Sequence, residues 1–189
     1  MAIKPEVYLA AGIQPRPLES DEAVRRVAIE TVLDDVILAM GRTDPEERDG
    51  VLSDLMGAAG RYGADDGYKI AKSLDANYSW DCDMELAEIF DQIPGNITDA
   101  ARAAVADWVK NFQVSPCLPI GEEVTYHGND GIILNDGSGK YDSPGCYVVR
   151  VPSKGHTEHM GYVVAWEEID GRVNAKGPLP ATIEGPLFG

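Results

Sequence analysis

The sequence of 189 residues predicts an α+β protein, in which a bundle of about five helices precedes a small antiparallel β-barrel. Two observations predict this fold class. Apolar residues recur at helical spacing as far as Val114, and beyond it short β-rich runs alternate with turns. We therefore expect an acidic helical domain at 1–113, a linker at 114–119, a β-barrel domain at 120–170 and an irregular tail at 171–189.

The first two helices have recognisable ends. Ser20 is a good N-cap for a helix that ends at Gly41. Its apolar stripe consists of Val24, Ala28, Val32 and Val36. Asp44-Pro45-Glu46-Glu47 has the form of a capping box with proline at the first helical position. This motif predicts a second helix, which ends at Gly63.

Three more helices are predicted before the linker. The third covers Asp65 to Asp75, and its inward residues are expected to be Tyr68, Ala71 and Leu74. The fourth runs from Trp80 to Ile93 and is broken by Pro94-Gly95. Its expected buried residues are Trp80, Met84, Ala87, Phe90 and Ile93. Thr98 caps the fifth, whose apolar face is Ala101, Ala104, Val105, Trp108, Val109 and Phe112.

The β part opens with a hairpin. Strands at Val124 to His127 and Ile132 to Asn135 flank the turn sequence Gly128-Asn129-Asp130-Gly131. Further strands are predicted at Cys146 to Val151 and Tyr162 to Glu168. The lead-in Pro119 to Tyr126 and the return Gly131-Ile132-Ile133 resemble the opening hairpin of SH3-like barrels. That resemblance implies an SH3-like barrel and no particular function, since such barrels serve many tasks.

The charge balance excludes several classes of partner. Sixteen Lys and Arg against 32 Asp and Glu give a net charge of −16, which disfavours direct binding to nucleic acid and to anionic membranes. The longest apolar stretch, Val36 to Met40, is too short to span a membrane, and no signal peptide is expected. Three cysteines without a close pair favour a reducing compartment, so we expect a cytoplasmic protein.

No metal or cofactor is expected. His156-Thr157-Glu158-His159, with His127 and Cys146 elsewhere, offers potential ligands. However, its two histidines lack the spacing of a helical zinc pair, so exposed loop histidines are expected. Asp81-x-Asp83-x-Glu85 begins like a calcium loop, but Leu86 stands where such a loop needs glycine.

The sequence predicts no catalytic residue. Cys82 lies between Asp81 and Asp83, and two flanking carboxylates would raise the pKa of its thiol. Cys146 has no motif that links it to a histidine. An enzyme is therefore not expected, although a small hydrolase that uses carboxylates or His156 and His159 remains an alternative.

The strongest feature of the sequence is an acidic surface. Between Lys72 and Arg102 there are seven acidic residues and no basic one. On a continuous helix, Asp81, Glu85 and Glu88 would share one face. The candidate partner-binding residues are Asp75, Asp81, Asp83, Glu85, Glu88 and Asp91, with Glu30, Asp34 and Asp35 from the first helix. They are either ordinary solvated faces or a surface for a basic protein groove that holds nucleic acid.

A second resemblance bears on this choice. The stretch from Tyr62-Gly63-Ala64-Asp65-Asp66-Gly67-Tyr68 to Trp80-Asp81-Cys82-Asp83-Met84-Glu85-Leu86 resembles uncharacterised acidic proteins of proteobacterial phages and plasmids. Such mobile elements carry anti-CRISPR and antirestriction proteins, several of which are DNA mimics. The resemblance implies a non-enzymatic inhibitor that blocks the nucleic-acid-binding groove of a host CRISPR or restriction complex. The alternative is a general protein–protein interaction module that uses the β domain.

Overall fold

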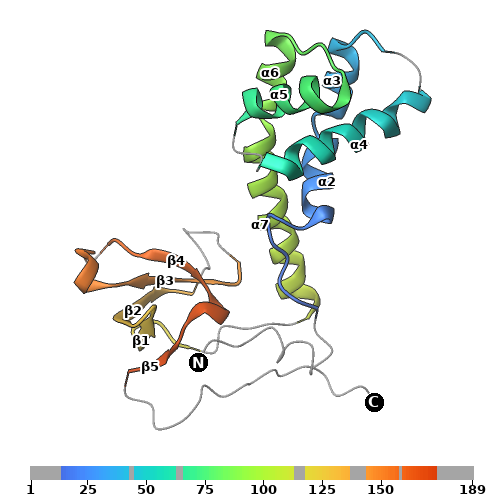
Figure 1. Ribbon diagram of the computed structural model, residues 1–189. Coiled ribbons are helices and arrows are strands. Elements are labelled where there is room, and N and C mark those ends of the chain that lie inside the picture. Colours follow the sequence, from blue (N-terminus) through green and yellow to red (C-terminus); the bar gives the residue numbers. More distant parts are fainter. Residues whose placement is uncertain are drawn as a thin grey trace, which may run out of the picture. The chain divides into compact units, whose positions relative to one another are not determined.

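The computed structural model describes residues 14–42, 45–62, 66–112, 118–136, 144–157 and 159–173 (Figure 1). These residues form helices and an antiparallel sheet, so the predicted α+β class is confirmed. The chain forms two compact units. The helical unit holds residues 17–104, and the strand unit holds the described residues from 105 onward together with 14–16.

The described helices are α2 (Glu22–Glu30), α3 (Leu33–Ala39), α4 (Pro45–Tyr62), α5 (Gly67–Tyr78), α6 (Met84–Phe90) and α7 (Ile93–Asn111). The prediction of one helix from Ser20 to Gly41 was wrong, because α2 and α3 are separate. The Thr31 hydroxyl donates to the carbonyl of Ala28 at 2.7 Å, and the Val32 N–H bonds to Ile29. This tighter turn ends α2, which is preceded by Asp21 rather than Ser20 as N-cap.

The predicted fourth helix is shorter than expected. Asp83 caps α6, because its carboxylate accepts from the Leu86 N–H at 3.0 Å. A helix that begins here buries Leu86 and Phe90, and it leaves Met84 75% exposed. The prediction that Met84 points inward was therefore wrong, whereas the prediction for Phe90 is confirmed.

Two of the three inward residues predicted for α5, Ala71 and Leu74, are confirmed as buried. The buried residues of this helix include Gly67, Ile70, Ala71 and Leu74, which recur at helical spacing. Tyr68 lies beside this stripe and is 62% exposed, so its predicted burial was wrong. The ammonium of Lys72, one turn further on, lies 5.5 Å from the centroid of the Tyr68 ring.

Helix α7 begins at Ile93, before the predicted cap at Thr98. Pro94-Gly95 lies inside its first turn and does not break a helix, because proline is tolerated where the N–H groups lack helical partners. The Thr98 hydroxyl does not cap the helix; it bonds to the carboxylate of Glu19 at 3.1 Å. Farther along, the buried Trp108 indole donates to the carbonyl of Gln14 at 2.8 Å.

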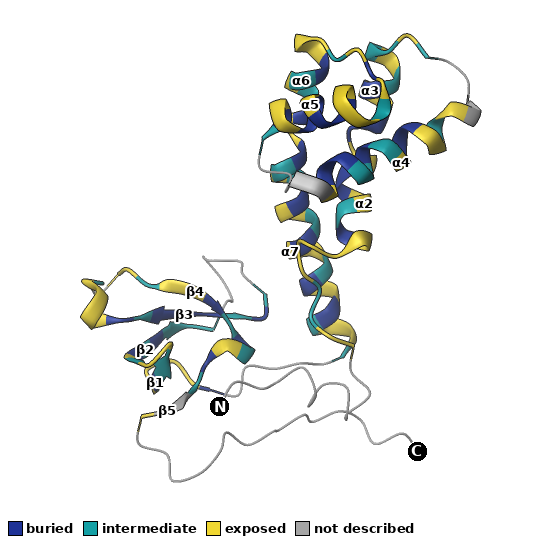
Figure 2. Ribbon diagram, in the orientation of Figure 1, coloured by how far each residue is buried: buried dark blue, intermediate teal, exposed yellow. Residues whose placement is uncertain are grey.

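The helical unit has its own apolar core (Figure 2). Phe90 and Leu55 are completely buried in it, and the Trp80 ring lies 6.5 Å from that of Phe90. The Trp80 indole donates to the carboxylate of Asp54 at 2.9 Å, so its polar atom is paired. Helices α3 and α6 both contact this core, which brings their outer faces close together.

The sheet contains β1 (Glu123–Tyr126), β2 (Asn129–Asn135), β3 (Cys146–Arg150), β4 (Tyr162–Ala165) and β5 (Gly171–Arg172), in the order β4-β3-β2-β1-β5. The predicted hairpin joins β1 and β2, but its turn is His127-Gly128, with φ values of 47° and 71°. A two-residue turn with positive φ at both positions matches the twist of the strands. Asn129, Asp130 and Gly131, predicted as part of the turn, therefore belong to β2.

The described strands form an open sheet and do not close into the predicted barrel, since β4 and β5 are its two edges. One face of the sheet carries a second core, in which Ile133, Tyr147 and Val149 are completely buried. Trp166, in the short 3-10 helix η3 (Trp166–Glu168), packs 6.0 Å from the Tyr147 ring. The Tyr147 hydroxyl accepts from the Leu118 N–H at 2.9 Å.

Arg16 is anchored in the strand unit. Its guanidinium donates to the carbonyl of Gly145 at 2.6 Å and to the sulfur of Cys146 at 3.1 Å, and it lies 3.6 Å from the carboxylate of Glu167. Burial raises the pKa of Glu167, while a backbone hydrogen bond and Arg16 act in the opposite direction. A chain segment from the start of the sequence thus belongs to the fold of the sheet.

Some predictions fall outside the described residues. These are the cap at Asp44, the helix start at Asp65, most of the linker at 114–119 and the tail beyond Val173. The predicted tail begins with β5 (Gly171–Arg172). In the described part of the chain, no helix has both the length and the apolar character needed to cross a membrane.

Candidate functional site

All nine acidic residues predicted to bind a partner are exposed: Glu30, Asp34, Asp35, Asp75, Asp81, Asp83, Glu85, Glu88 and Asp91. They nevertheless differ in what their carboxylates do. Four of them hold local structure. Asp34 pairs with Arg48, Asp75 accepts from the Cys82 N–H, Asp83 caps α6, and Asp91 accepts from the Gly67 N–H.

Three of the remaining acids lie together in one cleft. Asp35 of α3 and Glu85 and Glu88 of α6 line a cleft of about 470 Å³ in the helical unit. Its other lining residues are Leu38, Ala39, Ile89 and Gln92. Within the described residues, the structure gives these three carboxylates no hydrogen bond or ion pair. We call this site the acidic cleft.

The acidic cleft also has apolar walls. The Leu38 side chain is 78% exposed, and Ala39 and Ile89 are half-buried beside it. A lysine or arginine side chain combines an apolar stem with a charged head. The cleft therefore matches such a side chain, with apolar walls for the stem and carboxylates for the head.

The predicted face of Asp81, Glu85 and Glu88 is not formed. Asp81 precedes the N-cap of α6, so it does not continue the helical spacing of the other two. Glu30 is the last residue of α2 and does not line the cleft. Asp35 of α3, and not Asp81, therefore lies in the cleft with Glu85 and Glu88.

The Cys82 thiol is a weak acid, as expected from the carboxylates on either side of it in the sequence. Its pKa is raised to about 12, first by burial, then by a hydrogen bond and the charge of Asp75, and then by Asp83 and Asp81. The direction expected from the flanking carboxylates is confirmed, although burial and Asp75 contribute more. A thiol in these surroundings is a poor nucleophile at neutral pH.

We expect Cys82 to be alkylated slowly by iodoacetamide. A pKa of about 12 in place of the ordinary 9.0 leaves about a thousandfold less thiolate at about pH 8. Mass spectrometry of the Cys82 peptide measures the rate, and the same peptide in the chain unfolded by guanidinium is the reference. Asp75→Asn should increase the rate in the folded protein. Equal rates in the folded and unfolded chains would contradict the assignment.

The histidines of the predicted loop do not meet at one site. The His156 Nδ1 accepts from the Val151 N–H at 3.2 Å, and its ring contacts that of Tyr162, whereas His159 is exposed. Across the described residues, no group of three or more His, Cys, Asp or Glu side chains could hold a metal ion.

Sequence reasoning missed a row of four rings on the strand unit, formed by Tyr126, His127, His156 and Tyr162. The period-two alternation of strands could have indicated part of it. It places Tyr126 on the face of Val124, and Tyr162 on the face of Val164. No sequence signal indicated that the two tyrosines, from β1 and β4, would meet.

Comparisons of the chain with protein-family models, with curated proteins and with solved structures found no match.

Proposed function

We propose that this protein is a non-enzymatic inhibitor of a mobile genetic element, acting in the cytoplasm as a DNA mimic of the anti-CRISPR or antirestriction type. Its acidic helical surface occupies the nucleic-acid-binding groove of a host defence complex, with the acidic cleft at the centre of the contact. The observation that carries this proposal is that Asp35, Glu85 and Glu88 converge on one cleft from two helices. For the strand unit we propose a relationship to SH3-like barrels in which the sheet stays open, supported by the β1–β2 hairpin.

Electrostatics explains why such a surface would compete with DNA. A basic groove attracts phosphates through positive potential, and a net charge of −16 is attracted in the same way. The apolar walls add contacts that phosphates lack. The protein itself should not bind DNA, because both carry negative charge.

Competition binding tests the proposal. Purified CRISPR effector complexes and restriction enzymes are each bound to labelled target DNA, and the protein is added at two salt concentrations. We expect displacement of DNA from at least one complex. Inhibition should weaken as the Debye length falls from about 10 Å at 0.1 M salt to about 3 Å at 1 M, mainly through slower association.

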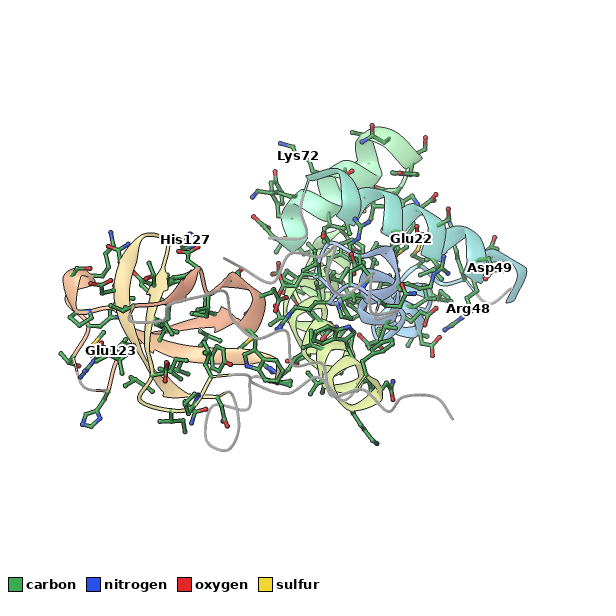
Figure 3. The ribbon with its side chains drawn as sticks, turned by 90° about the horizontal axis from the view of Figure 1, so that it is seen from below. Glu22, Arg48, Asp49, Lys72, Glu123 and His127 are labelled. Atoms are coloured by element: carbon green, nitrogen blue, oxygen red, sulfur yellow. The ribbon has the colours of Figure 1, made fainter. Side chains whose placement is uncertain are left out.

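Two triple variants locate the contact. Asp35→Lys with Glu85→Lys and Glu88→Lys should abolish displacement at low salt. Glu22→Lys with Asp49→Lys and Asp107→Lys makes the same change in net charge at exposed positions outside the cleft (Glu22 and Asp49 are labelled in Figure 3). The second variant should keep most of the inhibition. Equal inhibition by both variants, or no displacement from any complex, would refute the proposal.

A further inference from the structure

The rings of the strand unit form a continuous row. The centroid of Tyr126 lies 4.2 Å from that of His127 and 6.0 Å from that of Tyr162, which lies 4.3 Å from that of His156. The rings come from β1, the β1–β2 turn, β4 and the loop before β4. We call these four residues the aromatic row. His127 lies at the end of the hairpin (Figure 3).

Backbone interactions hold the row in place before any ligand binds. Tyr126 is paired with Asn129 and Tyr162 with Val149 in the sheet. The Val151 N–H donates to the Nδ1 of His156, which fixes the orientation of that ring. A preorganised surface loses less conformational entropy on binding.

Only part of the row packs against the core of the strand unit. Tyr126 is half-buried against the core of the strand unit, whereas His127 is exposed and Tyr162 is 42% exposed. Tyr147 and Trp166 provide the contrast within this unit, because both of these aromatic rings are buried. The outer side of the row is therefore accessible to solvent at His127 and Tyr162.

Two acidic residues lie near these rings. Asp170 accepts from the Gly128 N–H at 3.2 Å, which holds it beside the hairpin, and Glu168 is exposed on η3. Burial raises the pKa of Tyr126, and the negative charges of Glu168 and Asp170 raise it further. Both acids thus act electrostatically on the ring at the centre of the row.

Ring faces beside carboxylates attract cations. The face of an aromatic ring carries negative potential, and a planar guanidinium stacks on it while its N–H groups bind a carboxylate. A nucleic acid could also stack its bases on the rings, but its phosphates would meet Glu168, Asp170 and a chain of net charge −16. The charges therefore favour arginine.

We propose that the aromatic row binds an arginine-bearing segment of a partner protein, with the guanidinium stacked on the exposed ring of Tyr162 and paired with Glu168 or Asp170. This binding surface belongs to the strand unit and does not depend on the acidic cleft. It gives the protein a second contact whose ligand is an arginine side chain.

Titration of the isotope-labelled protein with synthetic peptides tests this proposal by NMR. The probe is a capped peptide that alternates arginine with alanine. Matched peptides carry lysine or neutral citrulline in place of arginine. We expect the arginine peptide to shift the signals of Tyr126, Tyr162 and His156. The lysine peptide should bind more weakly, and the citrulline peptide should not bind.

Three variants make the test specific. Tyr162→Leu and Glu168→Gln should each weaken binding of the arginine peptide about fivefold or more. Tyr68→Leu replaces another exposed tyrosine, on α5 of the helical unit, and should leave the affinity unchanged. If the affinity is unchanged in Tyr162→Leu and Glu168→Gln, or if a short single-stranded oligonucleotide shifts the same rings instead, the proposal is wrong.

Discussion

Replacing Phe90 with alanine should destabilise the helical unit by about 3–5 kcal/mol, because a completely buried ring leaves a cavity in a core that relaxes only partly. Domains are stable by about 5–15 kcal/mol in total, so this single change removes a large share of the stability. Urea unfolding followed by far-UV circular dichroism measures the loss.

Met84→Ala is the matched control for Phe90→Ala. Both residues belong to α6, but Met84 is 75% exposed while Phe90 is completely buried. Met84→Ala should change the free energy of unfolding by no more than about 0.5 kcal/mol. Comparable losses in the two variants would mean that α6 presents a different face to the core.

Gly67→Ala should also be strongly destabilising, by about 1–3 kcal/mol, because there is no space for the added methyl group. An ideal Cβ at Gly67 would lie 2.5 Å from the backbone nitrogen of Asp91 and 2.7 Å from the carbonyl oxygen of Ala87. Backbone atoms cannot move aside as a flexible side chain can. The start of α5 must therefore separate from the end of α6.

Gly50→Ala provides the comparison within the same unit. An added Cβ at Gly50, in the interior of α4, meets no atom within 4 Å. Alanine has the higher helix propensity, so this variant should be more stable by about 0.5–1 kcal/mol. Thermal unfolding should show a lower melting temperature for Gly67→Ala and a higher one for Gly50→Ala than for the unaltered protein. A stabilised Gly67→Ala variant would contradict the close approach of α5 and α6.

Local patterns predicted most of the helices because long amphipathic stripes are read directly from the sequence. The stripe of Val24, Ala28 and Val36 is buried as expected. The errors arose near misplaced helix ends, as at Met84, which is the first residue of α6 and is 75% exposed. Gly67 illustrates a related limit: its low helix propensity is visible in the sequence, but its contact with Asp91 is not.

The candidate site was predicted in its chemistry but not in its geometry. The acidic residues were evident from composition, and all nine are exposed. The acidic cleft depends on the turn between α2 and α3, which the periodicity did not indicate. Neither Asp35 nor Leu38 carries a sequence feature that pairs it with Glu85, because their approach is set by packing in the core.

The position of Arg16 has a consequence for the order in which the protein folds during synthesis. The groups that accept hydrogen bonds from its guanidinium follow it by 128 to 130 positions along the chain, and Glu167, its ion-pair partner, follows it by 151. All of residues 17–104 leave the ribosome before these partners do. The helical unit can therefore complete its core before the partners of Arg16 have been synthesised. Closing so long a loop slows the final step of folding. A fragment that begins in the linker at 114–119 would lack this arginine and the end of α7, so separate production of the strand unit requires residues 14–16 and the part of α7 from Val105 onward to be supplied.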